Sequence, residues 1–312
     1  MEFIKADRPT FYFIGVTTTK SMIMNVFPLW AKELGLKDAV IKGIDIGIHE
    51  KPEVYREVVD FLKNDELSLG ALVTTHKIDI YDAAKDMFDY LDPYATAFGE
   101  LSSISKKNGK LEGYAKDPIS SGLAMEAFVP KGFWKEHKGE LFLLGAGGSA
   151  ISIGAYWMRK EHGDNMPSKI IVNNRSQPRL DSIREIFEQL NPGIPVEYNL
   201  TPEPSQSDVT LAKLKPYSIV INATGLGKDR PGSPLTDHCK YPQNCLIWEL
   251  NYRGERRFQH QTEEQMKEKG LYVEDGWIYF IHGWTQVIAE VFHLNISNDV
   301  FDKLVKIANS IK

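Results

Sequence analysis

Glycines follow a predicted strand in residues 140–151, which read ELFLLGAGGSAI and continue with the spacing of a helix. The pattern Gly145-x-Gly147-x-x-Ala150 matches G-x-G-x-x-A. Glycine lets a phosphate approach the backbone where a Cβ would otherwise stand, and free N–H groups at the helix start then bind the anion. The stretch therefore predicts a dinucleotide-binding turn, with a ligand-free glycine turn as the alternative. The residues predicted to bind the cofactor here are Gly145, Ala146, Gly147, Gly148, Ser149 and Ala150.

Two arginines lie at the end of the next predicted strand, in the sequence NRSQPR at 174–179. A site for NAD has an acidic residue here, which accepts hydrogen bonds from the ribose 2′-hydroxyl. A 2′-phosphate requires Arg and hydroxyl donors instead, and this stretch contains no Asp or Glu. The sequence therefore predicts NADP as the cofactor; the alternative is that both arginines are solvated surface residues. The residues predicted to bind it are Asn174, Arg175, Ser176 and Arg179.

A further strand end is rich in glycine, in the sequence INATGLG at 221–227. A flat nicotinamide and its ribose fit close to a backbone of this kind. We therefore assign Asn222, Ala223, Thr224 and Gly225 to the cofactor site, although a tight turn without a ligand would have the same sequence.

Strands and helices alternate along the chain, which places these turns at strand ends. The predicted strands are 10–16, 39–46, 67–73, 141–144, 169–172, 196–200, 217–222, 245–250 and 271–273. The predicted helices are 22–34, 52–62, 78–91, 118–128, 148–162, 180–190, 261–269, 277–292 and 298–311. Such alternation is typical of a parallel sheet covered on both faces by helices. Asn108-Gly109 predicts one antiparallel hairpin within the first series.

Asp117-Pro118 marks the predicted domain boundary, since Asp is a good helix cap and Pro a good first helical residue. A chain of 312 residues is long enough for two domains with separate cores. The predicted fold class is α/β with two domains, and the second alternating series is a doubly wound nucleotide-binding domain.

The composition is that of an ordinary globular protein, with 42% hydrophobic residues, 25% charged residues and a formal charge of −5. This charge gives no preference for nucleic acid or for an anionic membrane. The N-terminus MEFIKADRPT has no apolar signal segment and no stretch approaches the ~20 apolar residues of a membrane span, so we expect a cytoplasmic protein. Cys239 and Cys245 are too sparse for a zinc site or a disulfide framework, so we expect free thiols and no metal.

Taken together, the motifs resemble the shikimate dehydrogenase family almost end to end. The resemblance rests on GAGGSA at 145–150, NRSQPR at 174–179, INATGLG at 221–227, Glu249-Leu-Asn-Tyr252, and VTTHK at 73–77 with GYAKD at 113–117. It implies a substrate-binding and catalytic domain of residues 1–117 plus 283–312. It also implies a Rossmann-type NADP-binding domain of residues 118–282, with a cleft where the two domains meet.

The resemblance further implies that Lys77 and Asp117 form the catalytic pair. Hydride transfer between C4 of the nicotinamide and a carbinol carbon needs a group that moves the hydroxyl proton, and a charged partner that fixes that group. Lys77 would be the general acid/base, with burial easing loss of its proton when the cleft closes, and Asp117 would hold it and accept a second substrate hydroxyl. A solvated lysine and a plain helix-capping aspartate are the alternatives.

The substrate pocket departs from the family pattern. A Ser-x-Ser pair is reduced to Ser21-Met22-Ile23, and Ser102, Ala115 and Gly283 occupy positions where the family has amide side chains. Each hydroxyl left unpaired costs roughly 1–3 kcal/mol, so we do not favour shikimate itself as the substrate. The residues expected to bind the substrate are Ser21, Lys20, Thr74, Ser102 and Tyr252, and Gly276 joins the cofactor set.

The sequence thus predicts reversible hydride transfer between NADP(H) and a ring alcohol or ketone of a shikimate- or quinate-like polyhydroxy carboxylate. The expected partners are this small molecule and, in a homodimer, a second copy of the chain; a monomer is the other expectation. An NADP-binding sensor or scaffold that has lost turnover is the alternative function.

Overall fold

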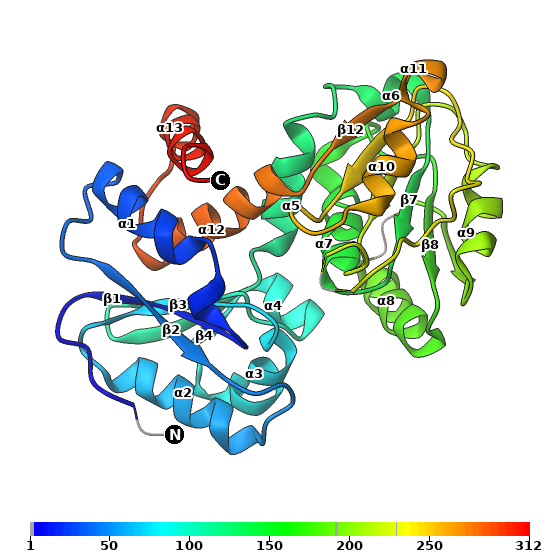
Figure 1. The fold of residues 1–312 in the computed structure, drawn as a ribbon. Coiled ribbons are helices and arrows are strands. Elements are labelled where there is room, and N and C mark those ends of the chain that lie inside the picture. The colour runs from blue at the N-terminus through cyan, green and yellow to red at the C-terminus, as the bar shows by residue number, and fades with distance from the viewer. Residues whose placement is uncertain (1–2, 191–192, 229) are drawn as a thin grey trace. The chain divides into compact units, whose positions relative to one another are not determined.

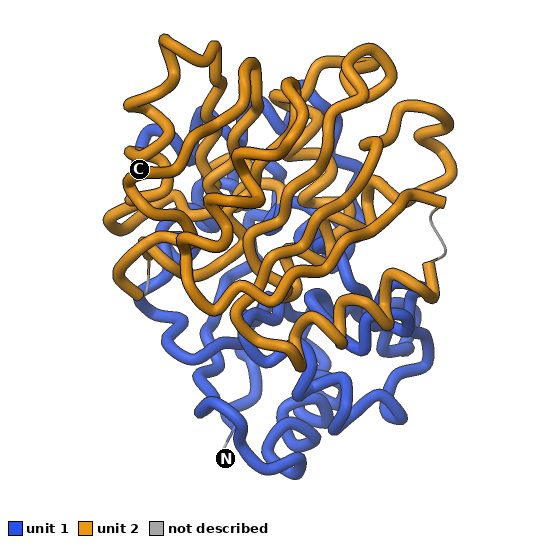
Figure 2. The backbone as a smooth tube through the Cα atoms, turned by 90° about the vertical axis from the view of Figure 1, so that its right-hand side faces the viewer, with its two compact units in different colours: residues 1–117, 283–312 blue, residues 118–282 orange. Residues whose placement is uncertain are grey.

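A computed structural model describes residues 3–190, 193–228 and 230–312. The chain divides into two compact units, coloured separately in Figure 2. Unit 1 comprises residues 1–117 and 283–312, and unit 2 comprises residues 118–282. Both ends of the chain therefore belong to unit 1, and unit 2 is inserted between them in the sequence. No helix among the described residues is long and apolar enough to cross a membrane.

Unit 1 is built on a mixed sheet with the strand order β2-β1-β3-β5-β6-β4. Its strands are β1 (Thr10–Gly15), β2 (Val40–Asp45), β3 (Ser68–Val73), β4 (Tyr90–Leu91), β5 (Ser103–Lys107) and β6 (Lys110–Tyr114). β1 is parallel to both β2 and β3, whereas β5 is antiparallel to β3 and β6. The hairpin predicted at Asn108-Gly109 is confirmed, because both residues have positive φ angles and join β5 to β6.

Helices cover both faces of this sheet (Figure 1). They are α1 (Ile23–Glu33), α2 (Pro52–Asn64), α3 (Lys77–Ala84), α4 (Pro93–Phe98) and α13 (Asn298–Asn309), with the 3₁₀ turns η1 (Thr18–Lys20) and η2 (Lys85–Met87). α5 (Asp117–Glu126) begins in unit 1 and α12 (Trp277–Val291) ends in it, so each of these helices passes from one unit into the other.

Alternate residues of β1 pack against opposite layers, which is why the whole strand is buried. The Phe11 ring lies 5.5 Å from Phe27 of α1, and the Phe13 ring lies 4.8 Å from Trp284 of α12. Tyr12, between them, belongs to the cluster formed with α2 on the other face. β1 is therefore held in place from both faces, and this fixes where the loops after β1 and β3 begin.

Unit 2 contains a parallel sheet with the strand order β12-β11-β10-β7-β8-β9. Its strands are β7 (Leu141–Leu144), β8 (Ile170–Asn174), β9 (Val196–Leu200), β10 (Ile219–Asn222), β11 (Leu246–Glu249) and β12 (Tyr272–Glu274). Counted within the unit, this order is 3-2-1-4-5-6 from the far edge, the doubly wound order. The predicted Rossmann-type fold is confirmed, and the order reverses between β7 and β10.

The helices of unit 2 lie on both faces of its sheet (Figure 1). They are α6 (Phe133–His137), α7 (Gly148–Trp157), α8 (Gln177–Leu190), α9 (Pro204–Leu211), α10 (Arg257–Glu263) and α11 (Met266–Lys269), with the 3₁₀ turn η3 (Lys160–His162). Leu141 and Leu143 of β7 join the cluster that includes α7 and α8, whereas Phe142 and Leu144 join the cluster that includes α9 and α10. β7 is thus buried from both sides, and its carboxyl end is held where the glycine turn begins.

The helix predicted over 78–91 is wrong in its second half. α3 ends at Ala84, and the chain continues through η2 into β4. The backbone N–H of Asp89 donates to the carbonyl of Leu111, and the Asp89 carboxylate accepts from the N–H of Leu111, both at 2.8 Å. Pairing with β6 therefore replaces the helix here.

Three short helices, α4, α6 and α9, were not predicted from the sequence, because apolar periodicity does not indicate them. α4 and α9 each begin with a proline and a side-chain cap, since Asp92 accepts from the N–H of Ala95 at 2.6 Å and Glu203 forms a capping box with Gln206. The helix predicted over 261–269 is two helices, α10 and α11, and α7 ends at Trp157, before the predicted end.

Candidate active site

A cavity of about 750 Å³ opens in unit 2 at the carboxyl ends of β7, β8 and β10. This is the place where the strand order reverses, and open α/β sheets bind their ligands at such a point. The predicted cofactor residues that line the cavity are Gly145, Ala146, Gly147, Gly148, Asn174, Arg175, Ser176, Arg179, Ala223, Thr224 and Gly225. The structure thus brings together three segments that are far apart in the sequence.

Four other residues predicted to bind the cofactor, Ser149, Ala150, Asn222 and Gly276, are not among those that line this cavity. Ala150 is buried inside α7, and Asn222 is buried at the end of β10. Gly276 is also buried, and a Cβ there would stand 1.9 Å from the carbonyl oxygen of Leu250. In this structure these three residues support the backbone around the cavity, and a direct contact with the cofactor stays a prediction.

The glycine turn needs its first glycine for a structural reason. Gly145 has a φ of +117°, and a Cβ on it would lie 2.8 Å from the carbonyl oxygen of Ala223. Gly147 is the N-cap of α7, and no described atom lies within 4 Å of the position that its Cβ would occupy. No described side chain caps the start of α7, so its first N–H groups are available to an anion.

Arg175 and Arg179 line the cavity and are exposed. Neither guanidinium has an ion-pair or hydrogen-bond partner among the residues that the structure describes. Unpartnered guanidinium groups at the edge of a phosphate-binding cavity are suited to bidentate recognition of a second phosphate.

Several residues of the cavity were not predicted from the sequence. They are Leu144, Asn173, Thr201, Pro202, Pro204, Ser207, Leu226, Arg230 and Pro234. Thr201 could have been found, because it follows β9 and the carboxyl ends of parallel strands meet at one edge of the sheet. Arg230 lies in an irregular loop and has no comparable signal.

Glu249 holds the turn after β10 in place. Its buried carboxylate accepts hydrogen bonds from the amide Nδ2 of Asn222 at 3.1 and 2.9 Å, from the backbone N–H of Asn251 at 2.9 Å and from Asn251 Nδ2 at 2.7 Å. Asn222 Oδ1 in turn accepts from the N–H and hydroxyl of Thr224, at 3.1 and 2.6 Å. Burial raises the pKa of Glu249 to about 7, although the donors around it favour the ionised form.

Glu249→Gln should destabilise the protein by about 1–3 kcal/mol, because a glutamine NH₂ would face N–H groups that now donate to a carboxylate. Urea denaturation at a pH above 8, where Glu249 is ionised, measures this change in the free energy of unfolding. Glu263→Gln on α10 is the matched control, since the Glu263 side chain is partly exposed. Equal stability of the two variants would show that the Glu249 network does not hold the turn.

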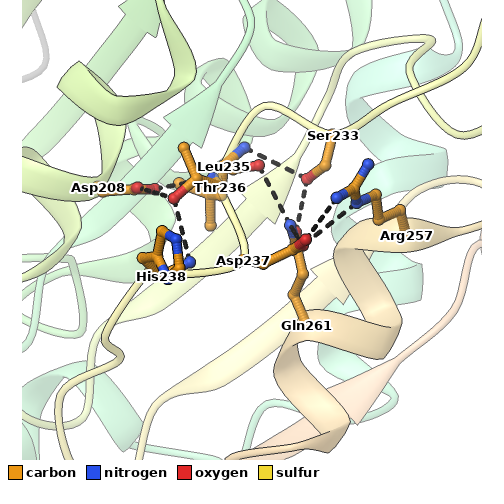
Figure 3. Close-up of polar contacts among 8 residues, drawn as sticks. All are labelled: Asp208, Ser233, Leu235, Thr236, Asp237, His238, Arg257 and Gln261. Atoms are coloured by element: carbon orange, nitrogen blue, oxygen red, sulfur yellow. Dashed lines mark hydrogen bonds and ion pairs between the residues drawn. The ribbon is translucent and has the colours of Figure 1, made fainter.

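The loop of residues 233–238 borders the cavity through Pro234 and is fixed to α9 and α10 (Figure 3). One carboxylate on α9 accepts hydrogen bonds from the loop, while an arginine and a glutamine on α10 bind the loop's own aspartate. The residues in this network are Asp208, Ser233, Leu235, Thr236, Asp237, His238, Arg257 and Gln261. These contacts hold this edge of the cavity in place.

Lys77 and Asp117 contact each other directly in unit 1, through Lys77 Nζ and Asp117 Oδ2. Lys77 is the first residue of α3 and Asp117 the first residue of α5, so two separate helix starts supply the pair. Their side chains are 22% and 18% exposed. The pair is thus largely shielded from water but still accessible to a small molecule.

Residues 100–102 hold the two halves of the pair together. The N–H of Leu101 donates to the carbonyl of Lys77 at 3.0 Å, and the hydroxyl of Ser102 accepts from the N–H of Lys116 at 2.7 Å. Ser102 is 2% exposed, because it enters the sheet between β3 and β6. In the structure this hydroxyl bonds the backbone next to Asp117, and its predicted contact with the substrate stays a prediction.

His76, which precedes Lys77, is fully buried. Its Nε2 lies 3.1 Å from the carbonyl oxygen of Ile46, and its Nδ1 lies 3.4 Å from the hydroxyl of Tyr55. Together with the positive φ of Thr75, these contacts fix the turn from which Lys77 projects.

The pKa of Lys77 differs from the one that burial alone would give. Burial lowers the pKa of the Lys77 ammonium, but the negative charges of Asp117 and Glu100 outweigh this effect and hold that pKa above its usual range. Burial thus acts in the expected direction, but the two carboxyl groups outweigh it in this structure, and the effect of closing the cleft stays a prediction. Lys77 is an ammonium at neutral pH.

The other residues predicted to bind the substrate lie in both units. Lys20 is exposed and Ser21 half-buried in the loop after β1. Thr74 is half-buried at the end of β3, and its methyl group would lie 3.0 Å from a Cβ on Gly15, so the loops after β1 and β3 are neighbours. Tyr252 belongs to unit 2, with its ring packed on two aromatic side chains of α12 at 5.5 and 4.9 Å.

Clusters of three or more His, Cys, Asp or Glu side chains that could hold a metal ion do not occur among the described residues. Cys239 and Cys245 are buried free thiols, and burial raises the pKa of each to about 12.

A doubly wound unit with a phosphate-binding turn, joined to a second α/β unit that carries a half-buried Lys–Asp pair, defines a two-unit dehydrogenase. No family model matches the chain. A shikimate dehydrogenase (NADP(+)) of Bacillus cereus is 34% identical over 238 residues, which cover 74% of this chain and 76% of that protein. The chain belongs to the shikimate dehydrogenase family.

Two further comparisons agree with this result. A shikimate dehydrogenase (NADP(+)) of Lactococcus lactis is 28% identical over 186 residues, or 59% of this chain, and the match spans 62% of that protein's length. The solved structure of a quinate dehydrogenase from Corynebacterium glutamicum in complex with NAD has the same fold, with a TM-score of 0.74 at 17% identity over 96% of this chain and 98% of that chain.

Proposed function

We propose that the protein is an NADP-dependent dehydrogenase of shikimate dehydrogenase type. It would interconvert a ring alcohol and a ketone on a shikimate- or quinate-like polyhydroxy carboxylate. Residues 118–282 would bind NADP, and residues 1–117 with 283–312 would bind the substrate and carry the proton-transfer group. The observation that carries this proposal is the direct Lys77–Asp117 contact, in a chain whose other unit has a phosphate-binding turn with two unpartnered arginines.

In this mechanism Lys77 moves the proton. NADPH supplies the hydride when it is bound. Lys77 Nζ donates a proton to the substrate oxygen during ketone reduction and takes it back during alcohol oxidation. Asp117 accepts a hydrogen bond from the ammonium, which fixes the direction of that proton. The nearby carboxyl groups hold the pKa of Lys77 above its usual range, so the ammonium, the form that donates a proton to the ketone, persists to higher pH than in an ordinary lysine.

The unpartnered guanidinium groups of Arg175 and Arg179 support NADP rather than NAD as the cofactor. They stand at the end of β8, where the adenosine ribose lies in doubly wound domains. The named relatives support the same choice, because they are called NADP(+) enzymes. We also propose a cytoplasmic location, which the two free thiols support.

The alternative of a sensor that binds NADP without turnover has no support among the relatives. The contact between Lys77 and Asp117 also argues against it, because a protein without turnover needs neither group in that geometry.

The proposal is tested by following NADPH fluorescence with a panel of dehydroshikimate, dehydroquinate and related ring ketones. We expect NADPH oxidation by at least one carboxylated ketone, with dehydroshikimate not the best substrate. Tight NADPH binding without oxidation by any member would contradict the dehydrogenase and favour the sensor.

A further inference from the structure

Glu100 is a buried carboxyl group next to the pair formed by Lys77 and Asp117. It follows the left-handed Gly99 after α4, and the residue is 6% exposed. Its backbone N–H is bonded to the carbonyl of Ala95 at 3.3 Å. Its Oε1 atom is buried and accepts no hydrogen bond from any residue that the structure describes. Burying a carboxyl oxygen without a hydrogen-bond donor costs free energy, so the position of Glu100 needs an explanation.

The backbone places Glu100 beside Lys77. The next residue, Leu101, is bonded to the Lys77 carbonyl at 3.0 Å, so the chain at 100 runs against the first turn of α3. The charged groups that act on the Glu100 carboxyl are Lys77 from α3 and Asp117 from α5. Glu100 acts in return on the Lys77 ammonium. The three side chains are therefore one interacting cluster of an ammonium and two carboxyl groups.

Glu100 can change its charge near neutral pH. Burial raises the pKa of Glu100 to about 7, with the Asp117 charge acting in the same direction and the Lys77 charge opposing it. When Glu100 is ionised, the cluster carries one ammonium and two carboxylates. When Glu100 is protonated, the ammonium faces only Asp117, and less negative charge holds its proton.

We propose that Glu100 is a positioning residue, which acts through Lys77: its negative charge, added to that of Asp117, keeps the proton on the Lys77 amine. This inference rests on the function proposed above. Glu100 then sets the pH at which Lys77 changes from a proton donor to a proton acceptor. It would therefore extend to higher pH the range in which Lys77 holds its proton, without touching the reacting atoms.

The charge can be removed with little change of shape, by Glu100→Gln in the full chain. Competitive acetylation of lysines, followed by mass spectrometry of the Lys77 peptide, measures the pKa of Lys77 without any turnover. We expect Glu100→Gln to lower that pKa by about 1 unit or more. The pH of half-maximal alcohol oxidation should fall by the same amount, because the neutral amine is the base in that direction. Glu100→Asp, which keeps the charge, should restore both values most of the way.

Glu33→Gln is the matched control. It also removes one carboxylate from unit 1, but from α1, where Glu33 is paired with Lys303 at 3.3 Å. This variant should leave the labelling profile of Lys77 and the pH profile unchanged. A role of Glu100 that was only structural would change stability and leave the pKa of Lys77 in place.

An unchanged pKa of Lys77 in folded Glu100→Gln would overturn the proposal. If that variant does not fold, Lys77→Met provides the reciprocal measurement, because loss of the ammonium should raise the pKa of the Glu100 carboxyl in ¹³C NMR. No change there would also overturn it. A shifted pKa of Lys77 with no turnover on any ring ketone would uphold the charge coupling and instead contradict the proposed reaction.

Discussion

Lys77→Met should lower kcat by about 10²–10⁴-fold, the range that a positioned proton-transfer group contributes. Methionine keeps the length of the side chain and its apolar stem but cannot donate a proton. Affinity for NADPH should stay within about twofold of wild type, since a group that acts only in the transition state changes kcat rather than binding. Steady-state oxidation of NADPH with the best ketone of the panel, together with fluorescence titration of the cofactor, measures both quantities.

Lys85→Met is the control for this variant, because Lys85 lies just beyond α3 and its ammonium sits over the ring of Tyr81, 5.4 Å from the centroid. It should turn over at the wild-type rate. Unchanged turnover in Lys77→Met would remove Lys77 from the reaction, and the mechanism would then have no proton-transfer group.

The double variant Arg175→Ala/Arg179→Ala should weaken NADPH binding by about 100-fold or more. Hydrogen bonds to charged groups contribute about 1.5–3 kcal/mol each, and both guanidinium groups are predicted to contact the same phosphate. Affinity for NADH should change little, because NADH lacks that phosphate. Fluorescence titrations of the two cofactors against wild type and variant measure the change in preference.

Arg184→Ala is the matched control for the arginine pair. Arg184 is on α8, as Arg179 is, but its guanidinium stacks on Tyr198 at 4.8 Å, and it does not line the cavity. This variant should bind both cofactors as wild type does. A wild-type protein that prefers NADH would show that Arg175 and Arg179 do not bind a 2′-phosphate.

The nucleotide-binding unit was the more predictable half of the molecule. Its glycine turn depends on local geometry, since Gly145 has a positive φ and Gly147 leaves open space. Requirements of this kind can be recognised from residues that are adjacent in the sequence. The alternation of strands and helices then places Arg175 at the same sheet edge. The doubly wound order followed from these local features.

The Lys77–Asp117 pair was not predictable from residue spacing alone. Its members are separated by 40 positions, and a lysine after a strand is usually solvated. Only the resemblance to the shikimate dehydrogenase family predicted that the two residues form a pair. Glu100 gave no signal at all, because burial of a carboxyl depends on packing by α3, β5 and α5 rather than on its neighbours in the chain.

The helix predicted over 78–91 shows a limit of prediction from local sequence. It failed because hydrogen bonds to Leu111 compete with the helical ones. Ser102, whose hydroxyl the resemblance assigns to the substrate, likewise has a backbone partner at Lys116, and its contact with the substrate stays a prediction. No window of local sequence contains either of these partners.

The insertion of unit 2 between the two parts of unit 1 sets an order for folding during synthesis. β1 is synthesised before unit 2, whereas Trp284, which packs on Phe13, and the Leu304 carbonyl, which accepts from the Trp30 indole at 2.8 Å, are synthesised after it. Unit 2 is contiguous and can finish folding while the aromatic face of β1 is still uncovered. The core of unit 1 can therefore close only after residues 284–304 have been synthesised.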